Sequence, residues 1–220
     1  MQYNKFVHKY QRIPKMKLLL MRHGESRHQA KQIELTAPDS ENGLTNTGIK
    51  QVEDTAHCFR GKISAIYVSP YNRTILTAQT FLNGIKMFLP INIDNRLREI
   101  DYGRFIAETK NTPEMIAVAT KQIAGDYEVR FGDTGENKRE IVTRFFEFLV
   151  DVFKEHNTTA DSVLAVTHGR AISITISEFC MINNLPVIHT GTKNAQIKEI
   201  ELTSERIYNV IQHIKKINSK

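Results

Sequence analysis

The sequence predicts an α/β fold of three layers, in which a largely parallel central sheet of about six strands is covered by helices on both faces. Short apolar runs alternate with longer amphipathic stretches along most of the chain. Two of these runs end in a histidine followed by a glycine, which puts reactive side chains at the sheet edge where such folds bind ligands. A length of 220 residues with 40% hydrophobic content is enough for one sizeable domain with its own core.

Six runs with strand character supply the expected sheet, and helix-like segments separate most of them. They are Lys17–Arg22, Ile63–Val68, Ile91–Asp94, Val163–Thr167, Ala195–Leu202 and Ile207–Gln212. The last two flank a short polar segment at Thr203-Ser204-Glu205. We therefore expect them to form a hairpin at the edge of the sheet.

Helix signals lie between the strands. Thr47–Arg60 places apolar side chains along one helical face and stops before Gly61, a typical residue to end a helix. Ser69-Pro70 is expected to open the next helix, with serine as the N-cap and proline at the first helical position. Ile141–Phe153 is strongly apolar on one side, and Ile106–Asn137, the least regular region, is expected to form an excursion over one face.

The positive charge of the chain is concentrated at its start. The formal net charge is +6, and residues 1–16 hold four basic residues, Lys5, Lys9, Arg12 and Lys15, and no acidic one. We therefore divide the chain into a basic N-terminal extension, residues 1–16, and a single domain, residues 17–220. Phe6, Tyr10 and Ile13 would suit a short amphipathic helix on an anionic surface, but so short a pattern fits a flexible or loosely docked extension better. The charge distribution argues against a nucleic-acid-binding face.

Two further features of the sequence bear on the cellular compartment of the protein. Cys58 and Cys180 have neither a CxxC partner nor metal-ligand spacing, which suits a reducing environment. No apolar run reaches the length of a membrane span, and the start of the chain lacks the apolar core of a signal peptide. The sequence predicts a cytoplasmic protein without a transmembrane segment.

The chemistry gathers at the strand ends. The first strand ends in Arg22-His23-Gly24, where the imidazole could attack a phosphoryl group while the guanidinium holds its oxygens. His168-Gly169 ends a second strand in the same way. Arg73 falls in the first turn of a helix, where free N–H groups favour an anion, and Glu99 follows the third strand. Each residue alone has an ordinary structural explanation, but together they form a coherent phosphate site.

Metal binding is the competing interpretation of His23 and His28, which lie five positions apart. Their spacing differs from the HExxH helix motif, and arginines flank the first histidine and would repel a cation. We therefore expect neither a metal nor another cofactor.

Seven segments resemble the histidine phosphatase superfamily, in its phosphoglycerate-mutase-like branch, and they follow the order of that family. They are spread from about Lys17 to about Leu202, which is nearly all of the chain outside its two tails. They are Arg22–Ser26, Leu44–Gln51, Ser69–Ala78 with Thr74 in place of the usual alanine, Leu97–Gly103, Gly135-Glu136 with Arg144, Thr167–Gly169 and Asn194-Ala195.

The resemblance implies a role for each matching residue. His23 would be the nucleophile that becomes phosphohistidine, and Glu99 would protonate the leaving oxygen. The phosphate and substrate contacts would come from Arg22, Arg73, His168, Gln29 and Tyr102. A neutral imidazole can attack without first losing a proton, provided that its other ring nitrogen is held as a donor, which we expect a backbone carbonyl to accept.

Three departures from the mutase pattern favour a phosphatase. Gln29 stands where mutases usually carry asparagine, Phe105–Glu108 replaces an acidic-Gly pair, and the 69 positions from Glu99 to His168 are few for the helical insertion of true mutases. We expect a metal-independent phosphatase of small phosphomonoesters, and a phosphoprotein substrate stays open. The alternatives are a bisphosphate-primed mutase and a catalytically weak interaction protein on the same fold. Basic side chains near the site indicate an anionic substrate; they are Arg27, His28, Lys31, Arg98 and Arg104.

Overall fold

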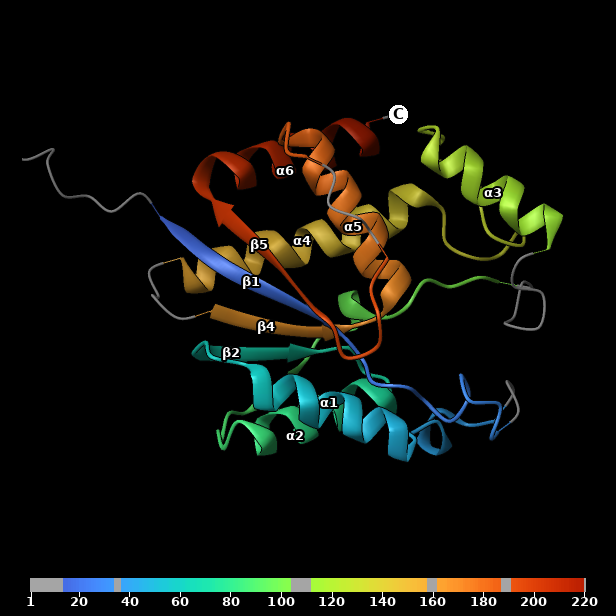
Figure 1. Cartoon of the computed structure of the whole chain (residues 1–220). Helices are drawn as coiled ribbons and strands as arrows, with labels where there is room; N and C mark the ends of the chain where they lie inside the picture. Colours follow the sequence, from blue (N-terminus) through green and yellow to red (C-terminus); the bar gives the residue numbers. More distant parts are fainter. Residues whose placement is uncertain (1–13, 34–36, 104–111, 158–161, 187–190, 220) are drawn as a thin grey trace, which may run out of the picture.

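A computed structural model describes residues 14–33, 37–103, 112–157, 162–186 and 191–219. Within these ranges one five-stranded sheet forms the centre of the molecule, in the order β3-β2-β4-β1-β5 (Figure 1). Four strands are parallel, and β5 pairs antiparallel with β1 at one edge. The strands are β1 (Lys15–Arg22), β2 (Ile63–Val68), β3 (Ile91–Ile93), β4 (Ser162–Thr167) and β5 (Ile197–Thr203).

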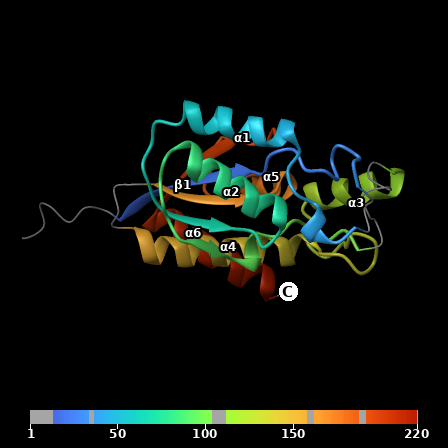
Figure 2. The same cartoon turned by 90° about the horizontal axis from the view of Figure 1, so that it is seen from below.

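Helices cover both faces of this sheet, as Figures 1 and 2 show. One face carries α1 (Asn46–Cys58) and α2 (Asn72–Gly84), and the other carries α4 (Lys138–His156), α5 (Gly169–Ile182) and α6 (Ser204–Asn218). In both views α3 (Pro113–Ile123) lies beyond the carboxyl ends of the parallel strands. The three-layer α/β/α fold expected from the sequence is confirmed.

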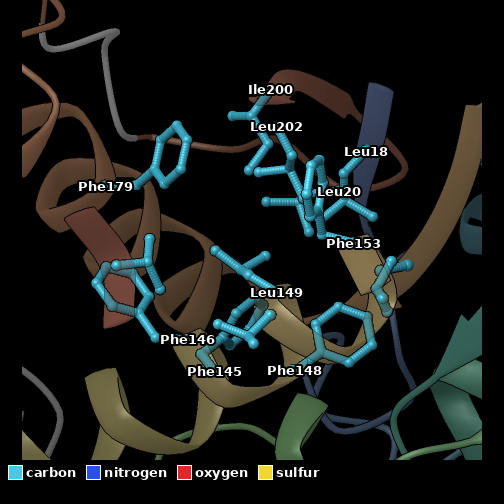
Figure 3. Packing of buried hydrophobic residues seen from close by; sticks show 14 of the residues in the cluster. Leu18, Leu20, Phe145, Phe146, Phe148, Leu149, Phe153, Phe179, Ile200 and Leu202 are labelled. Carbon is cyan, nitrogen blue, oxygen red and sulfur yellow. The ribbon is translucent and has the colours of Figure 1, made fainter. Parts of the chain in front are cut away.

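Successive side chains of β1 point to opposite faces of the sheet, so this strand contributes to both hydrophobic clusters of the core. Leu18 and Leu20 pack with the phenylalanines of α4 and with Ile200 of β5 (Figure 3). Leu19 and Met21 point to the other face, where they pack with residues of α1 and α2. Both faces of this central strand are therefore buried, which explains why its sequence is a continuous apolar run rather than an alternating one.

The expected strand at Ile207–Gln212 is wrong, because these residues lie within α6. Thr203 caps the helix by accepting a hydrogen bond from the Arg206 N–H at 3.3 Å. Ile207, Val210 and Ile217 are the buried side chains of α6, and they recur at helical spacing. The sheet therefore has five strands among the described residues, and there is no edge hairpin at this position.

Two expected helix ends also differ. α1 ends at Cys58, two residues before the expected Arg60, and Gly61 does not adopt a left-handed conformation. α2 begins at Asn72 rather than at Pro70, and Ser69 is not its N-cap. The Asn72 N–H instead donates to the carboxylate of Asp39 at 2.7 Å, so a distant segment satisfies this helix terminus.

The irregular region contains a helix that was not expected. Thr112 caps α3 by accepting from the Met115 N–H at 3.2 Å, and Pro113 takes the first helical position. The preceding residues 106–111 lie outside the described part, as does most of the basic extension. β1 begins at Lys15, two residues before the expected strand start. In the parts that the structure describes, no helix is long and apolar enough to cross a membrane.

Candidate active site

The register of β1 on β4 brings the two histidine motifs together. Arg22 pairs with Thr167 in this parallel ladder, so the next residue of each strand, His23 and His168, leaves the sheet at the same edge. The two imidazole centroids lie 5.2 Å apart. Both side chains are buried, His23 at 4% exposure and His168 at 0%. The sequence prediction that the two histidines meet agrees with this geometry.

The His23 ring is held in one orientation by its own backbone. Its Nδ1 lies 2.7 Å from the carbonyl oxygen of Gly24, which can only accept, so in the neutral ring Nδ1 carries the proton. The lone pair then belongs to Nε2, the nitrogen required for nucleophilic attack. This is the backbone-carbonyl arrangement expected from the sequence.

The loop after His23 is braced against the start of α1. A Cβ at Gly24 would lie 2.5 Å from the Gly48 carbonyl oxygen, so only glycine allows this close approach. The Glu25 N–H donates to Gln51 Oε1 at 2.9 Å, and the Thr45 hydroxyl donates to Glu25 Oε1 at 2.8 Å. Thr45 and Gln51 of the Leu44–Gln51 motif thus brace the loop that carries His23.

Arg22 lies against the loop that precedes β5. One terminal nitrogen donates to the Thr192 carbonyl at 2.6 Å, whereas its buried Nε has no hydrogen-bond partner among the described residues. Burial lowers the pKa of this guanidinium, an effect that Glu99 opposes. A buried cationic donor without a partner is costly, and an oxyanion at this position would satisfy it.

Arg73 and His168 contact each other directly. A terminal nitrogen of Arg73 donates to His168 Nδ1 at 3.2 Å, because a guanidinium has no acceptor. Nε2 of His168 must then carry the ring proton, and it donates to the hydroxyl of Ser69 at 2.8 Å. Burial and the adjacent charge of Arg73 hold the pKa of His168 well below its ordinary value of 6.5. His168 is therefore a neutral side chain that orients Arg73.

Asp39 and Tyr71 complete the surroundings of Arg73, and the sequence analysis missed both. The guanidinium carbon lies 4.6 Å from the centre of the Tyr71 ring, and one terminal nitrogen lies 3.4 Å from the carboxylate of Asp39. Tyr71 follows the Ser69-Pro70 signal and could have been suspected from it. Asp39 is 34 residues distant in sequence, and no local pattern indicates this contact.

Glu99 lies at the N-terminus of α5. Its Oε1 accepts hydrogen bonds from the N–H of Ile100 at 3.0 Å and of Ala171 at 3.2 Å, the latter in the first turn of that helix. These bonds place the carboxyl group on the same edge of the sheet as His23 and Arg73. Neither bond involves the second oxygen, Oε2.

A buried ion pair holds the Glu99 loop from behind. Arg144 binds both carboxylate oxygens of Glu136, at 2.8 and 3.0 Å. A terminal nitrogen of Arg144 also donates to the carbonyls of Arg96 and Arg98, at 2.5 and 3.0 Å. The second Glu136 oxygen accepts from the Asp101 N–H at 3.0 Å. The sequence matched Glu136 and Arg144 to the start of a helix but did not reveal this supporting role.

Arg22, His23, Arg73 and Glu99 line a cleft of about 500 Å³ at the carboxyl edge of the sheet. Gln29 lines it, and its side-chain oxygen accepts from the Ser26 N–H and from the Asn194 amide. Burial raises the pKa of the Tyr102 hydroxyl, which also lines the cleft. The remaining described lining residues are Ser26, His28, Ala37, Asp39, Asn42, Tyr71, Arg98, Ile100, Asp101 and Gly103.

Not every expected residue reaches this cleft. His168 lies beneath it, in contact with Arg73, and is not among the lining residues. His28 and Arg98 line the cleft, whereas Arg27 and Lys31 do not. Arg104 and the segment 105–108 lie outside the described residues. Over the described ranges, no group of three or more His, Cys, Asp or Glu is arranged to hold a metal ion.

Comparison with known proteins places this site in a family. The chain matches the Histidine phosphatase superfamily (branch 1) over residues 18–214 and belongs to it. No curated protein matches the chain. Many solved structures share its fold, including phosphatases and phosphoglycerate mutase.

Three of these structures represent the mutases and the phosphatases among the structural neighbours. Phosphoglycerate mutase from Bacillus anthracis has a TM-score of 0.67 and 18% identity, over 91% of this chain and 97% of that one. Phosphoserine phosphatase from Entamoeba histolytica, solved with 3-phosphoglyceric acid, has a TM-score of 0.63 and 20% identity, over 87% and 99%. Mycobacterial glucosyl-3-phosphoglycerate phosphatase, solved with VO3, has a TM-score of 0.64 and 18% identity, over 87% and 94%.

Proposed function

We propose that this chain is a phosphatase that hydrolyses a phosphomonoester through a phosphohistidine formed on His23. The observation that carries the proposal is the 2.7 Å contact between His23 Nδ1 and the Gly24 carbonyl. It assigns the lone pair to Nε2, on a histidine that lines a cleft together with Arg22 and Arg73. A neutral nitrogen nucleophile beside two cations suits attack on a dianionic phosphate ester.

In the first step Nε2 of His23 forms a bond to phosphorus, and the bond from phosphorus to the ester oxygen breaks. Glu99, protonated at Oε2, transfers its proton to the departing alkoxide, so that a neutral alcohol leaves. In the second step the Glu99 carboxylate takes a proton from a water molecule while the oxygen of that water attacks phosphorus. The bond to Nε2 then breaks, inorganic phosphate forms, and both residues return to their starting state.

The two arginines would supply the charge that this transition state requires. The Nε of Arg22 has no hydrogen-bond partner in the described part of the chain, and it is a donor that a phosphoryl oxygen would satisfy. Arg73 is fixed by contacts on several sides, with His168, Tyr71 and Asp39, so its guanidinium is oriented before substrate arrives. Cations already in position make a divalent metal redundant, which supports metal independence as part of the proposal.

Hydrolysis is favoured over phosphoryl return to a bound product. The segment from Glu99 to His168 is short for the helical insertion of a mutase, and its described part contains only α3 and α4 as helices. The names of two structural neighbours, phosphoserine phosphatase and glucosyl-3-phosphoglycerate phosphatase, support a small phosphorylated substrate. A phosphoglycerate-mutase-type transfer is the second candidate, because a mutase is also among the neighbours.

The test is a rapid quench of the protein with a phosphorus-labelled ester, followed by detection of acid-labile label. We expect label on the wild type, none on His23→Ala, and near-normal label on His28→Ala, a matched histidine that also lines the cleft. Phosphate release that needs a bisphosphate primer would favour the mutase. A chain with neither label nor turnover on a broad panel of esters would be the interaction protein. Label retained by the His23 variant would remove that residue from its proposed role.

A further inference from the structure

A second cavity, of about 520 Å³, lies between α3 and α5. This volume falls within the range of roughly 300–1,000 Å³ that is typical of small-molecule sites. None of the described residues that line it also lines the phosphate cleft. Its described lining residues come from both helices, from Lys138 at the start of α4 and from Gly191 before β5.

Apolar side chains of two helices form the walls of this cavity. α3 contributes Ala119 and Ile123, and α5 contributes Ile174 and Met181. Ile123 is 84% exposed and Met181 is 54% exposed, although both are large apolar residues. Two helices that present such side chains around a hollow leave apolar surface in water, which is the usual mark of a binding site.

The lining of the cavity also includes an ion pair, Lys138 with Glu178. Lys138 Nζ lies 2.9 Å from Glu178 Oε2, and His213 Nε2 lies 2.9 Å from Glu178 Oε1, to which the Tyr127 hydroxyl also donates. Burial raises the pKa of Glu178, but hydrogen bonds from His213, Tyr127 and Lys138 outweigh it and lower the pKa to about 2. Glu178 is therefore a carboxylate at neutral pH and compensates the charge of Lys138.

Arg170 is the cation of this cavity that no described carboxylate compensates. It is exposed and lies in the first turn of α5. The described lining thus combines apolar side chains, the Lys138–Glu178 ion pair and one guanidinium without a carboxylate partner among the described residues. A guanidinium binds sulfonate, carboxylate and phosphate groups through its planar set of donors.

We propose that the cavity between α3 and α5 is a second binding site, for a small organic anion whose apolar body packs between Ile123 and Ile174 and whose charged group binds Arg170. The site is separate from the phosphate cleft, so the proposal does not depend on the reaction that His23 performs. Apolar burial would supply most of the affinity, and Arg170 would select anions over neutral compounds of the same shape.

Two probes with the same ring system test the proposal by fluorescence titration. Anilinonaphthalene sulfonate is an apolar organic anion, and phenylnaphthylamine lacks the sulfonate. We expect Arg170→Gln to weaken binding of the sulfonate probe about fivefold, the effect of one exposed ion pair, and to leave binding of the neutral probe unchanged. Ser177→Trp, which fills the cavity from α5, should abolish binding of both probes. Lys50→Gln, on α1 at the other face of the sheet, is the matched control and should change neither.

Three results would overturn the proposal. The first is equal binding of the sulfonate probe to the wild type and to Arg170→Gln, which does not depend on whether the tryptophan variant folds. The second is unchanged binding of both probes to a folded Ser177→Trp protein. The third is competitive displacement of the neutral probe as well as the sulfonate probe by vanadate or by inorganic phosphate, which would place both in the phosphate cleft instead.

Discussion

Replacement of Arg144 by methionine should destabilise the protein far more than the same replacement of Arg139 on the same helix. Both arginines form bidentate pairs, Arg144 with Glu136 and Arg139 with Glu128. They differ in burial. The side chains of the first pair are 9% and 8% exposed, whereas those of the second are 32% and 60% exposed.

The structure sets the size of the difference. Removal of Arg144 leaves the carboxylate of Glu136 buried, and breaking such a pair typically costs about 3–5 kcal/mol. Arg98 and the Asp101 N–H still bind Glu136, so we expect a value near the lower end, about 3 kcal/mol. For a protein of this size that corresponds to a fall in Tm of about 6–12 °C. The exposed pair of Arg139 should contribute no more than about 1 kcal/mol.

Urea unfolding followed by circular dichroism measures both free energies, and a thermal scan provides the Tm. A second readout links this pair to the site, because Arg144 also binds the carbonyl of Arg98, next to Glu99. The folded Arg144→Met protein should therefore lose more activity on alkyl phosphates, which need a proton donor, than on nitrophenyl phosphate. Equal destabilisation by the two replacements, or less than about 1 kcal/mol lost at Arg144, would refute the reasoning.

Three further outcomes follow from the site. Glu99→Gln should slow hydrolysis of alkyl phosphates by about 10²–10⁴-fold and that of nitrophenyl phosphate much less, because the nitrophenolate leaves without a proton; equal losses in kcat would point to a structural role. Vanadate should inhibit competitively, as a five-coordinate mimic of the transition state, and excess chelator should leave the rate unchanged; loss of activity on chelation that Mg²⁺ or Zn²⁺ restores would contradict the metal-independent mechanism. The pKa of His168 is lowered in the folded protein, so below about pH 6.5 the unfolded chain binds a proton that the folded protein does not bind. The free energy of unfolding should therefore fall as the pH drops from 7.5 to 5. In urea titrations, His168→Gln should flatten this pH dependence, and His57→Gln, at an exposed histidine, should not.

The sheet edge that carries the site could be predicted because its information is local. Each of β1 and β4 is an apolar run that ends in His-Gly, and neighbouring parallel strands bring their carboxyl ends to one edge. The hydrogen bond of His23 Nδ1 to a backbone carbonyl could also be expected, since it involves the next residue. Features that depend on a single strand or turn are therefore the ones that the amino-acid sequence predicts well.

The end of the chain shows where local information is ambiguous. Ile207-Tyr208 and Val210-Ile211 satisfy a strand pattern over six residues, and the same residues satisfy a helical pattern over fifteen. The longer window is the one that tests periodicity, and Thr203 with Glu205 supplies an N-terminal cap and an acidic first turn. The correct assignment was present in the sequence but required the full length of the helix.

The rest of the site depends on contacts between segments that are distant in sequence. Ser69 was expected to cap its own helix, yet its hydroxyl accepts from His168, 99 residues away, while Asp39 satisfies the helix terminus instead. Neither contact is one that local rules assign. These contacts have a chemical consequence, because burial and the guanidinium at Nδ1 keep His168 neutral while the hydroxyl at Nε2 fixes its ring. A protonated His168 would repel Arg73, and the cation that the phosphate requires would lose its orientation. The serine that was expected to start a helix therefore helps to orient Arg73, through a histidine that does not line the cleft.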